Sequence, residues 1–194
     1  GAGNLLGEEQ SGHIKEVGYE LYQSMLEEAV AALRSGDASL AEDHWSPQIA
    51  VGAPVLIPEH YVPDLDVRLQ LYRRLSQFES DTEIEGFGAE LADRFGRTPE
   101  EVDDLLEVVR IKLLCRRAGI DKVDTGPKGI VLSFRDNRFA NPVGLVEFVG
   151  REGRLAKVRP DHTVVLKRDW PTARERLQGT RRLLAELAAI AEAA

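Results

Sequence analysis

The sequence predicts an α+β fold, in which a helix-rich first half is followed by a small mixed or antiparallel sheet with a C-terminal helix. Two observations lead to this prediction. Apolar residues recur at spacings of three and four through most of the stretch between residues 14 and 118, which is typical of amphipathic helices. From residue 120 onwards, short apolar runs alternate with glycine and proline turns, which is typical of strands.

The first predicted helix follows a glycine-rich start, residues 1–12. Its apolar stripe consists of Ile14, Val17, Leu21, Met25, Leu26, Ala29, Val30 and Leu33. Gly36 follows as a natural C-cap, and the polar stretch 35–47 reads as a linker. We therefore expect a lead-in segment over residues 1–46 and an α+β domain over residues 47–194.

Three helices are predicted after a short strand. Apolar residues alternate over residues 49–57 around Pro54, which indicates a strand at a sheet edge or a bulge. Asp64 or Asp66 caps a helix that carries Leu69, Tyr72 and Leu75. Capping-box spacings at residues 80–83 and 98–101 begin two further helices, which end at Gly96 and Gly119. Within the first of these, Gly86 and Gly88 are expected to permit close backbone contact.

The second half contains the predicted sheet. Strands are expected over residues 120–123 and 130–134, around a Gly-Pro-Lys-Gly turn at residues 126–129. Asn141-Pro142 begins a short helix through Phe148, and residues 155–158 and 163–166 form a hairpin. Pro171 starts a last amphipathic helix, whose apolar stripe is Leu177, Leu184, Leu187 and Ile190.

The composition is that of a globular protein. Hydrophobic residues make up 43% of the 194 residues and charged residues 30%. No apolar run approaches the roughly 20 residues that a membrane helix needs, and no secretion signal is visible, so we expect a cytoplasmic chain with no membrane contact. The single cysteine, Cys115, falls inside an apolar helical pattern and is expected to be a small core or surface residue.

The charge is distributed unevenly. Residues 1–107 contain 23 acidic and 7 basic side chains, whereas residues 108–194 contain 10 acidic and 18 basic ones. An acidic half repels nucleic acid and suits docking onto a basic protein surface, and the basic half suits contact with phosphates. The alternative is that both halves present ordinary solvated faces, whose charges partly neutralise one another in the fold.

Catalytic and metal-binding patterns are missing from the sequence. No histidine lies at metal-ligand spacing from another ligand, and neither a Gly-x-Ser-x-Gly elbow nor a Walker lysine loop occurs. The glycines of residues 1–7 do not have dinucleotide-loop spacing. Adjacent carboxylates, such as Glu100 and Glu101, are expected at helix starts because of the helix dipole. We therefore expect no catalytic residue, metal or cofactor in this chain.

One helical segment has a distinctive charged face. Glu90, Asp93 and Arg94 fall on one side of the helix predicted to end at Gly96. Their apolar neighbours fall on the opposite side: Leu91, Ala92 and Phe95. Such a face satisfies a basic and an acidic partner together. The alternative is an intrahelical Glu90–Arg94 pair, worth a few tenths of a kcal/mol.

Several stretches resemble the transcription-repair coupling factors of bacteria. The string GAGNLLGEEQSGHIKEVGYELYQSMLEEAV is similar to the segment that follows their helicase core, and its first part resembles a translocation motif shared with the helicase RecG. VLIPEHYVPDLDVRLQLYRRL, ELADRFGRTPEEV and the Asn141-Pro142 region resemble later parts of the same proteins. The resemblance extends over the whole chain and is loosest at residues 150–170.

The resemblance implies a place in an ATP-dependent translocase of double-stranded DNA that couples stalled RNA polymerase to nucleotide excision repair. ATP and Mg²⁺ would bind upstream of this chain, which would not hydrolyse ATP itself. The translocation motif would comprise Gly3, Gly7, Gln10 and Gly12. The rest would be an autoinhibitory domain that masks the UvrA-recruiting surface of a UvrB-like N-terminal module, through a contact motif formed by Glu90, Asp93 and Arg94.

A second hypothesis concerns the basic half. There the chain would contact double-stranded DNA through basic side chains around the predicted hairpin, which are Arg151, Arg154, Lys157, Arg159, Lys167 and Arg168. An independent enzyme is the third hypothesis, and no constellation in the sequence supports it.

Overall fold

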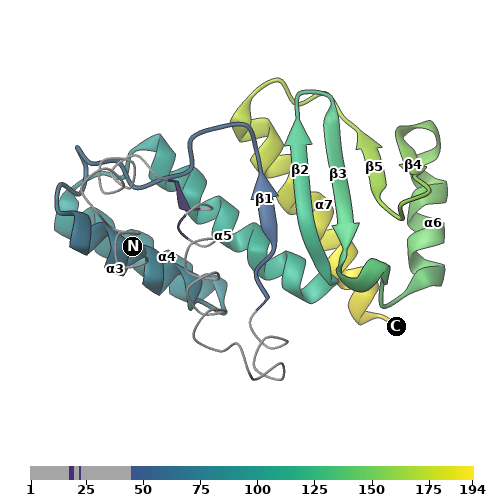
Figure 1. Ribbon diagram of the computed structural model, residues 1–194, viewed down its shortest axis with the longest axis horizontal. Coiled ribbons are helices and arrows are strands. Elements are labelled where there is room, and N and C mark those ends of the chain that lie inside the picture. The colour runs from purple at the N-terminus through teal and green to yellow at the C-terminus, as the bar shows by residue number, and fades with distance from the viewer. Residues whose placement is uncertain (1–17, 20–21, 23–44) are drawn as a thin grey trace, which may run out of the picture. The chain divides into compact units, whose positions relative to one another are not determined.

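A computed structural model describes residues 18–19, 22 and 45–194 of the chain (Figure 1). Most of the predicted lead-in helix, and all of the predicted translocation residues Gly3, Gly7, Gln10 and Gly12, lie outside these described residues. The chain divides into two compact units. Residues 54–106, with residues 18, 19 and 22, belong to the first, which we call the helical unit, and residues 45–53 and 107–194 belong to the second, the sheet unit.

The helical unit contains α3 (Leu65–Ser76), α4 (Asp81–Phe95) and the first turns of α5 (Glu100–Ala118). Asp64 is the N-cap of α3 and accepts a hydrogen bond from the Val67 amide, while Ser80 caps α4 in the same way. At Gly88 a methyl group would lie 3.2 Å from the Leu106 side chain, so a side chain rather than another backbone approaches this glycine closely. Gly86 does not, because it faces open space.

Aromatic residues hold the described part of the N-terminal segment against α3. The Tyr19 and Tyr22 rings lie 5.7 and 5.4 Å from the ring of Tyr72. The Tyr19 amide also donates to the Val55 carbonyl at 3.1 Å. The Tyr72 hydroxyl accepts from the Ile57 amide at 2.8 Å, so one buried side chain joins three stretches of the helical unit.

The sheet unit contains one five-stranded mixed sheet in the order β1-β2-β3-β5-β4 (Figure 1). Its strands are β1 (Gln48–Ala50), β2 (Ile120–Gly126), β3 (Gly129–Phe134), β4 (Ala156–Val158) and β5 (Val164–Lys167). β1 pairs with β2 in parallel, and the other pairs are antiparallel. The predicted α+β class, with a small sheet and a C-terminal helix, is confirmed.

The predicted strand over residues 49–57 is wrong in its second half. β1 ends at Ala50, and Gly52 adopts a φ of 68°, which turns the chain out of the sheet. Pro54 has no amide hydrogen for a strand ladder, and the residues after it form a loop in which Ile57 is buried and Val55 is partly buried.

Helix α7 (Ala173–Glu192) covers one face of the sheet. Buried residues alternate along β3, where Ile130, Leu132 and Phe134 point to one side. α7 lies across the sheet in Figure 1 and buries an apolar stripe that includes Leu177, Leu184 and Leu187. Thr172 and Glu175 form a full capping box at its start. None of the described helices is long and apolar enough to cross a membrane.

α6 (Pro142–Glu152) is longer than predicted, because Gly150 does not break it and Gly153 ends it with a φ of 59°. The Asn141 side chain caps α6 by accepting from the Gly144 amide at 3.0 Å. The same side chain donates to the Ile190 carbonyl of α7 at 3.0 Å. One residue therefore starts α6 and attaches it to α7. Short 3₁₀ turns flank the helix, η3 (Arg135–Asn137) before it and η4 (Gly153–Leu155) after it.

A candidate docking face on helix α4

α4 is anchored by an apolar stripe that leaves its charged face outward. Ile84, Phe87 and Leu91 have at most 2% of their surface exposed. The prediction that Ala92 belongs to the anchoring face is wrong, because Ala92 is exposed. The buried residues recur at spacings of three and four. Ala92 lies about 100° around the helix axis from its neighbour Leu91, so it falls outside this buried stripe.

The C-terminal end of α4, where the charged residues lie, is tightly closed. Gly96 ends the helix with a φ of 89° and donates its amide to the Ala92 carbonyl at 3.0 Å. The buried Tyr61 hydroxyl lies 3.0 Å from the Leu91 carbonyl oxygen and 2.7 Å from that of Gly96, and it donates to one of them at a time. These contacts satisfy carbonyl groups that a helix end leaves without partners. The last turn of α4 therefore has a fixed geometry.

Glu90 lies at the centre of an ion cluster. Its carboxylate accepts two hydrogen bonds from Arg74 of α3, with Nη1–Oε2 and Nη2–Oε1 distances of 2.6 and 2.9 Å. Arg94, one helical turn further along, donates to the same Oε2 at 3.0 Å. The expected intrahelical pair therefore exists, but it is one part of a three-residue network that joins two helices.

The network keeps Glu90 ionised and holds the guanidinium groups of Arg74 and Arg94 in place. Hydrogen bonding from Arg74, and then from Arg94, lowers the pKa of Glu90 to about 2, so its carboxylate stays ionised in acid that protonates an ordinary glutamate. Both guanidinium groups also lie over aromatic rings, Arg74 at 5.1 Å from the Phe87 ring centre and Arg94 at 4.8 Å from that of Phe95. The two cations are therefore oriented before any partner arrives.

Asp93 differs from Glu90 because it is exposed and has no ion pair with any residue that the structure describes. Arg94 is also exposed and uses one nitrogen for Glu90, so further donors of its guanidinium face solvent. The face therefore offers one unpaired carboxylate and one partly used guanidinium side by side. This arrangement can accept from a basic side chain and donate to an acidic one.

Arg74 is the residue that the sequence did not reveal. It lies 16 positions from Glu90, in the last turn of a different helix, so no helical periodicity connects the two residues. The pair forms because α3 and α4 pack side by side. The only signal was the presence of two consecutive arginines, Arg73 and Arg74, in the last turn of α3, which also suit the helix dipole.

The six basic residues of the second hypothesis do not act as one group. Arg151 of α6 pairs with Glu186 of α7 at 3.3 Å, and Arg168 pairs with Glu152 at 2.9 Å. The other four are exposed and form no ion pair with the described residues, and they are Arg154, Lys157, Arg159 and Lys167.

The register of the hairpin aligns three of these four side chains. Lys157 of β4 lies opposite Val165 of β5, and the Arg159 amide donates to the Thr163 carbonyl at 2.9 Å. Residues two apart on a strand point to the same side, so Lys157, Arg159 and Lys167 share one face of the sheet. That is the face opposite the buried residues Val164 and Leu166.

Comparison with known proteins places the chain in a family. A profile described as the TRCF domain matches residues 51–145, which include all three charged residues of α4. The transcription-repair-coupling factor of Rickettsia typhi is 42% identical over 165 residues, and that of Escherichia coli strain K12 is 32% identical over 189 residues. These alignments cover 85% and 96% of the chain. The chain belongs to the transcription-repair coupling factor family.

The chain spans 15% and 16% of the length of these two relatives. A crystal structure described as the C-terminal domain of a transcription-repair coupling factor has the same fold, with a TM-score of 0.62 at 18% identity. The match covers 77% of this chain and 96% of that one. The basic residues from Arg151 onwards lie beyond the part that the TRCF profile matches.

Proposed function

We propose that this chain is a regulatory interaction domain of a transcription-repair coupling factor, and that it docks through α4 onto the UvrB-like N-terminal module of the same protein. Docking would mask the surface of that module that recruits UvrA. The observation that carries the proposal is the charged cluster on the closed last turn of α4, in which Asp93 is unpaired and Arg94 is held in place.

A charged face suits a contact that must be released. Exposed ion pairs are worth about 0–1 kcal/mol each, and they add specificity without exposing a large apolar surface when the partner leaves. The pre-oriented guanidinium groups reduce the ordering cost of binding, because Glu90 and two aromatic rings already hold them. Such an interface would be specific, sensitive to salt and readily displaced.

In the wider protein, other segments would bind ATP and Mg²⁺ and move along double-stranded DNA, and engagement with stalled RNA polymerase would release the docked domain. Gly3, Gly7, Gln10 and Gly12 would belong to the motif that transmits ATP hydrolysis to this movement. The domain would then contribute regulation rather than catalysis.

Reversing the charges of the face tests the docking proposal. We expect the combined Glu90→Arg, Asp93→Arg and Arg94→Glu substitutions to weaken binding to the N-terminal region of the parent protein at least about tenfold, because like charges then meet across the interface. Thermal denaturation should change little, since exposed ion pairs contribute at most about 1 kcal/mol each. Titration calorimetry of the two purified parts at low and high salt gives the affinity, and thermal unfolding followed by circular dichroism gives the stability.

Glu85→Arg is the matched control, because Glu85 is an exposed acid on the same helix but belongs to no ion pair in the described chain. It should leave the affinity within about twofold of the unsubstituted chain. Binding that survives the triple reversal would show that the domain docks through another face.

A second candidate function rests on the aligned cations Lys157, Arg159 and Lys167, which suit the phosphates of double-stranded DNA. Contact through this face would make the domain an auxiliary DNA-binding part of the same translocase. Its test is the retardation of a DNA duplex by the purified chain at low salt, and the absence of a shift at high protein concentration would exclude it.

A further inference from the structure

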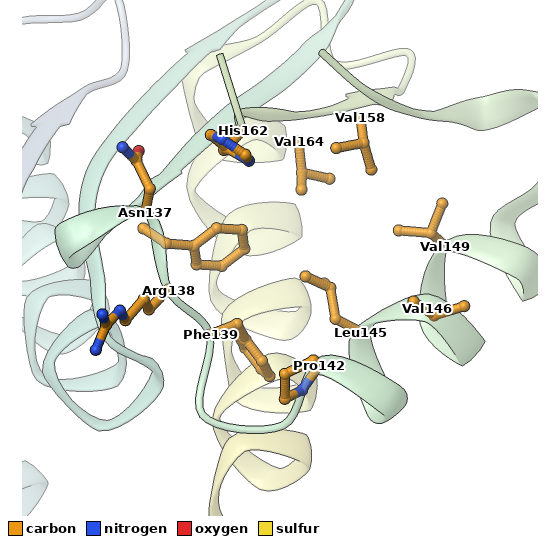
Figure 2. A pocket seen from close by; sticks show the side chains of 11 residues that line it. Asn137, Arg138, Phe139, Pro142, Leu145, Val146, Val149, Val158, His162 and Val164 are labelled. Atoms are coloured by element: carbon orange, nitrogen blue, oxygen red, sulfur yellow. The ribbon is translucent and has the colours of Figure 1, made fainter. Parts of the chain in front are cut away.

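The lead-in segment contacts the helical unit through three described residues, Gly18, Tyr19 and Tyr22, which meet α3 and the loop before it. This contact lies within one compact unit. By contrast, a groove between α6 and the β4–β5 hairpin is lined mainly by apolar residues, and the side chains of Asn137 and Arg138 point away from it (Figure 2). The lead-in contact is therefore the one whose partners the structure identifies.

Gly18 brings the lead-in segment close to the backbone of the loop before α3. A methyl group on Gly18 would lie 3.1 Å from the Val55 carbonyl oxygen, a tight distance for a side-chain carbon. The same oxygen accepts from the Tyr19 amide at 3.1 Å. The Tyr22 amide donates to the Gly18 carbonyl at 3.2 Å, so one helical turn places Tyr19 and Tyr22 on the same side. The segment therefore has a backbone attachment as well as an aromatic one.

Tyr72 receives both rings on one side of α3. The ring centres of Tyr19 and Tyr22 lie 5.7 and 5.4 Å from that of Tyr72, and Tyr19 and Tyr72 are both buried. Burial raises the pKa of Tyr22, and the positive charge of Arg73 opposes this rise, so the guanidinium lies near the phenol ring. Two consecutive residues of α3, Tyr72 and Arg73, therefore face the lead-in segment.

The next residue of α3 belongs to the docking face. Arg74 donates two hydrogen bonds to the Glu90 carboxylate. Successive residues of a helix are about 100° apart, so Arg74 points to the other side of α3 from Tyr72. Leu71 and Leu75 are buried and fix the helix between these two sides. The last turn of α3 thus touches the lead-in segment on one side and holds the charged cluster of α4 on the other.

We infer that the lead-in segment controls the docking face on α4 through the last turn of α3. While Tyr19 and Tyr22 lie on Tyr72, the turn keeps its position and Arg74 holds Glu90. Withdrawal of the segment would leave the Tyr72 side of the turn unsupported, and the ion pair on its other side would loosen. The inference rests on the docking function proposed above, and it connects the translocase segments that precede α3 with release of the docked domain.

The attachment of Tyr72 favours such coupling. Its hydroxyl accepts from the Ile57 amide at 2.8 Å, so the side chain is held at its far end as well as at the helix. It therefore transmits a displacement of the rings that lie on it, because rotation would break this hydrogen bond. Coupling between sites passes through packed side chains and rigid elements, and here a single helical turn separates the two contacts. A contact that only anchored the segment would leave the Arg74–Glu90 pair unchanged.

Tyr22→Ala in the complete chain tests the inference with two measurements. The NMR titration of the Glu90 carboxyl reports the ion pair without any partner protein. Its pKa of about 2, which hydrogen bonding from Arg74 lowers, should rise towards the ordinary glutamate value in the variant. Titration calorimetry with the N-terminal module should show an affinity about fivefold lower or more. Tyr22 is only partly buried, so circular dichroism should show an unchanged fold.

Asp64→Ala is the matched control on the same helix. Asp64 caps α3 by accepting from the Val67 amide, so its loss also destabilises the helical unit, but from the end away from Tyr72. The pKa of Glu90 should stay unchanged, and the affinity should change by less than about twofold. Gly18→Val tests the same contact with all three rings retained, since its side chain pushes the segment away from Val55, and it should raise the pKa of Glu90 as Tyr22→Ala does.

An unchanged Glu90 titration in Tyr22→Ala and Gly18→Val would overturn the inference, because the segment would then anchor the chain without acting on the docking face. An equal rise of the pKa in Asp64→Ala would overturn it as well, since any loss of stability would then loosen the ion pair. If the N-terminal module does not bind the unsubstituted chain, the docking proposal fails instead. The Glu90 titration then still decides whether α3 couples the lead-in segment to the charged cluster.

Discussion

Replacing Gly179 with alanine should destabilise the sheet unit by about 1–3 kcal/mol, although alanine is ordinarily the better helix former. Gly179 lies inside α7, and a methyl group there would overlap the indole ring of Trp170. The backbone of Trp170 cannot shift away freely, because hydrogen bonds hold it at both sides. Its amide donates to the Pro127 carbonyl at 2.8 Å, and its own carbonyl accepts from Arg176 at 3.0 Å. Either the ring or the helix must therefore move.

Gly86→Ala is the matched control for this substitution. Gly86 is also a helical glycine, but a methyl group there would meet nothing within 4 Å. It should therefore stabilise the protein by up to about 1 kcal/mol, since alanine restricts the unfolded chain more. Urea denaturation of the two variants separates the cases. If Gly179→Ala stabilises the protein as Gly86→Ala does, Trp170 adapts to the added methyl group at little cost.

The local signals in the sequence were sufficient to predict most helix ends. Ser80 and Asn141 cap the helices that follow them, and Gly96 and Gly119 end helices with positive φ. These features depend on a few neighbouring residues. The truncation of β1 was not predicted, because Ile49 pairs in parallel with Val123, far away in the chain. Such pairing is decided by the assembled sheet rather than by local alternation.

The same distinction applies to the docking face on α4. Glu90, Asp93 and Arg94 lie within one helix, so their shared face follows from helical geometry. Arg74 joins them only through the packing of α3 on α4.

Replacing Phe87 with alanine should cost about 3–5 kcal/mol, because Phe87 is 2% exposed and lies at the centre of the helical unit. Its ring meets Phe78 edge to face at 5.4 Å, and on its other side it supports the guanidinium of Arg74 at 5.1 Å. The substitution therefore leaves a cavity and removes the aromatic support of the cluster that holds Glu90. We expect a lower midpoint in urea denaturation together with weaker binding to the N-terminal module.

Phe87→Leu separates these two effects. Leucine keeps most of the buried volume, so the loss of stability should fall to about 1–2 kcal/mol and the chain should stay folded. The cation–π contact is absent from this variant, and such contacts are worth about 0.5–1 kcal/mol at exposed sites, which corresponds to a two- to fivefold loss of affinity. If Phe87→Leu binds the N-terminal module as tightly as the unsubstituted chain, the orientation of Arg74 does not contribute to docking. If it binds more weakly while remaining folded, a buried aromatic side chain controls the docking face through the arginine that it supports.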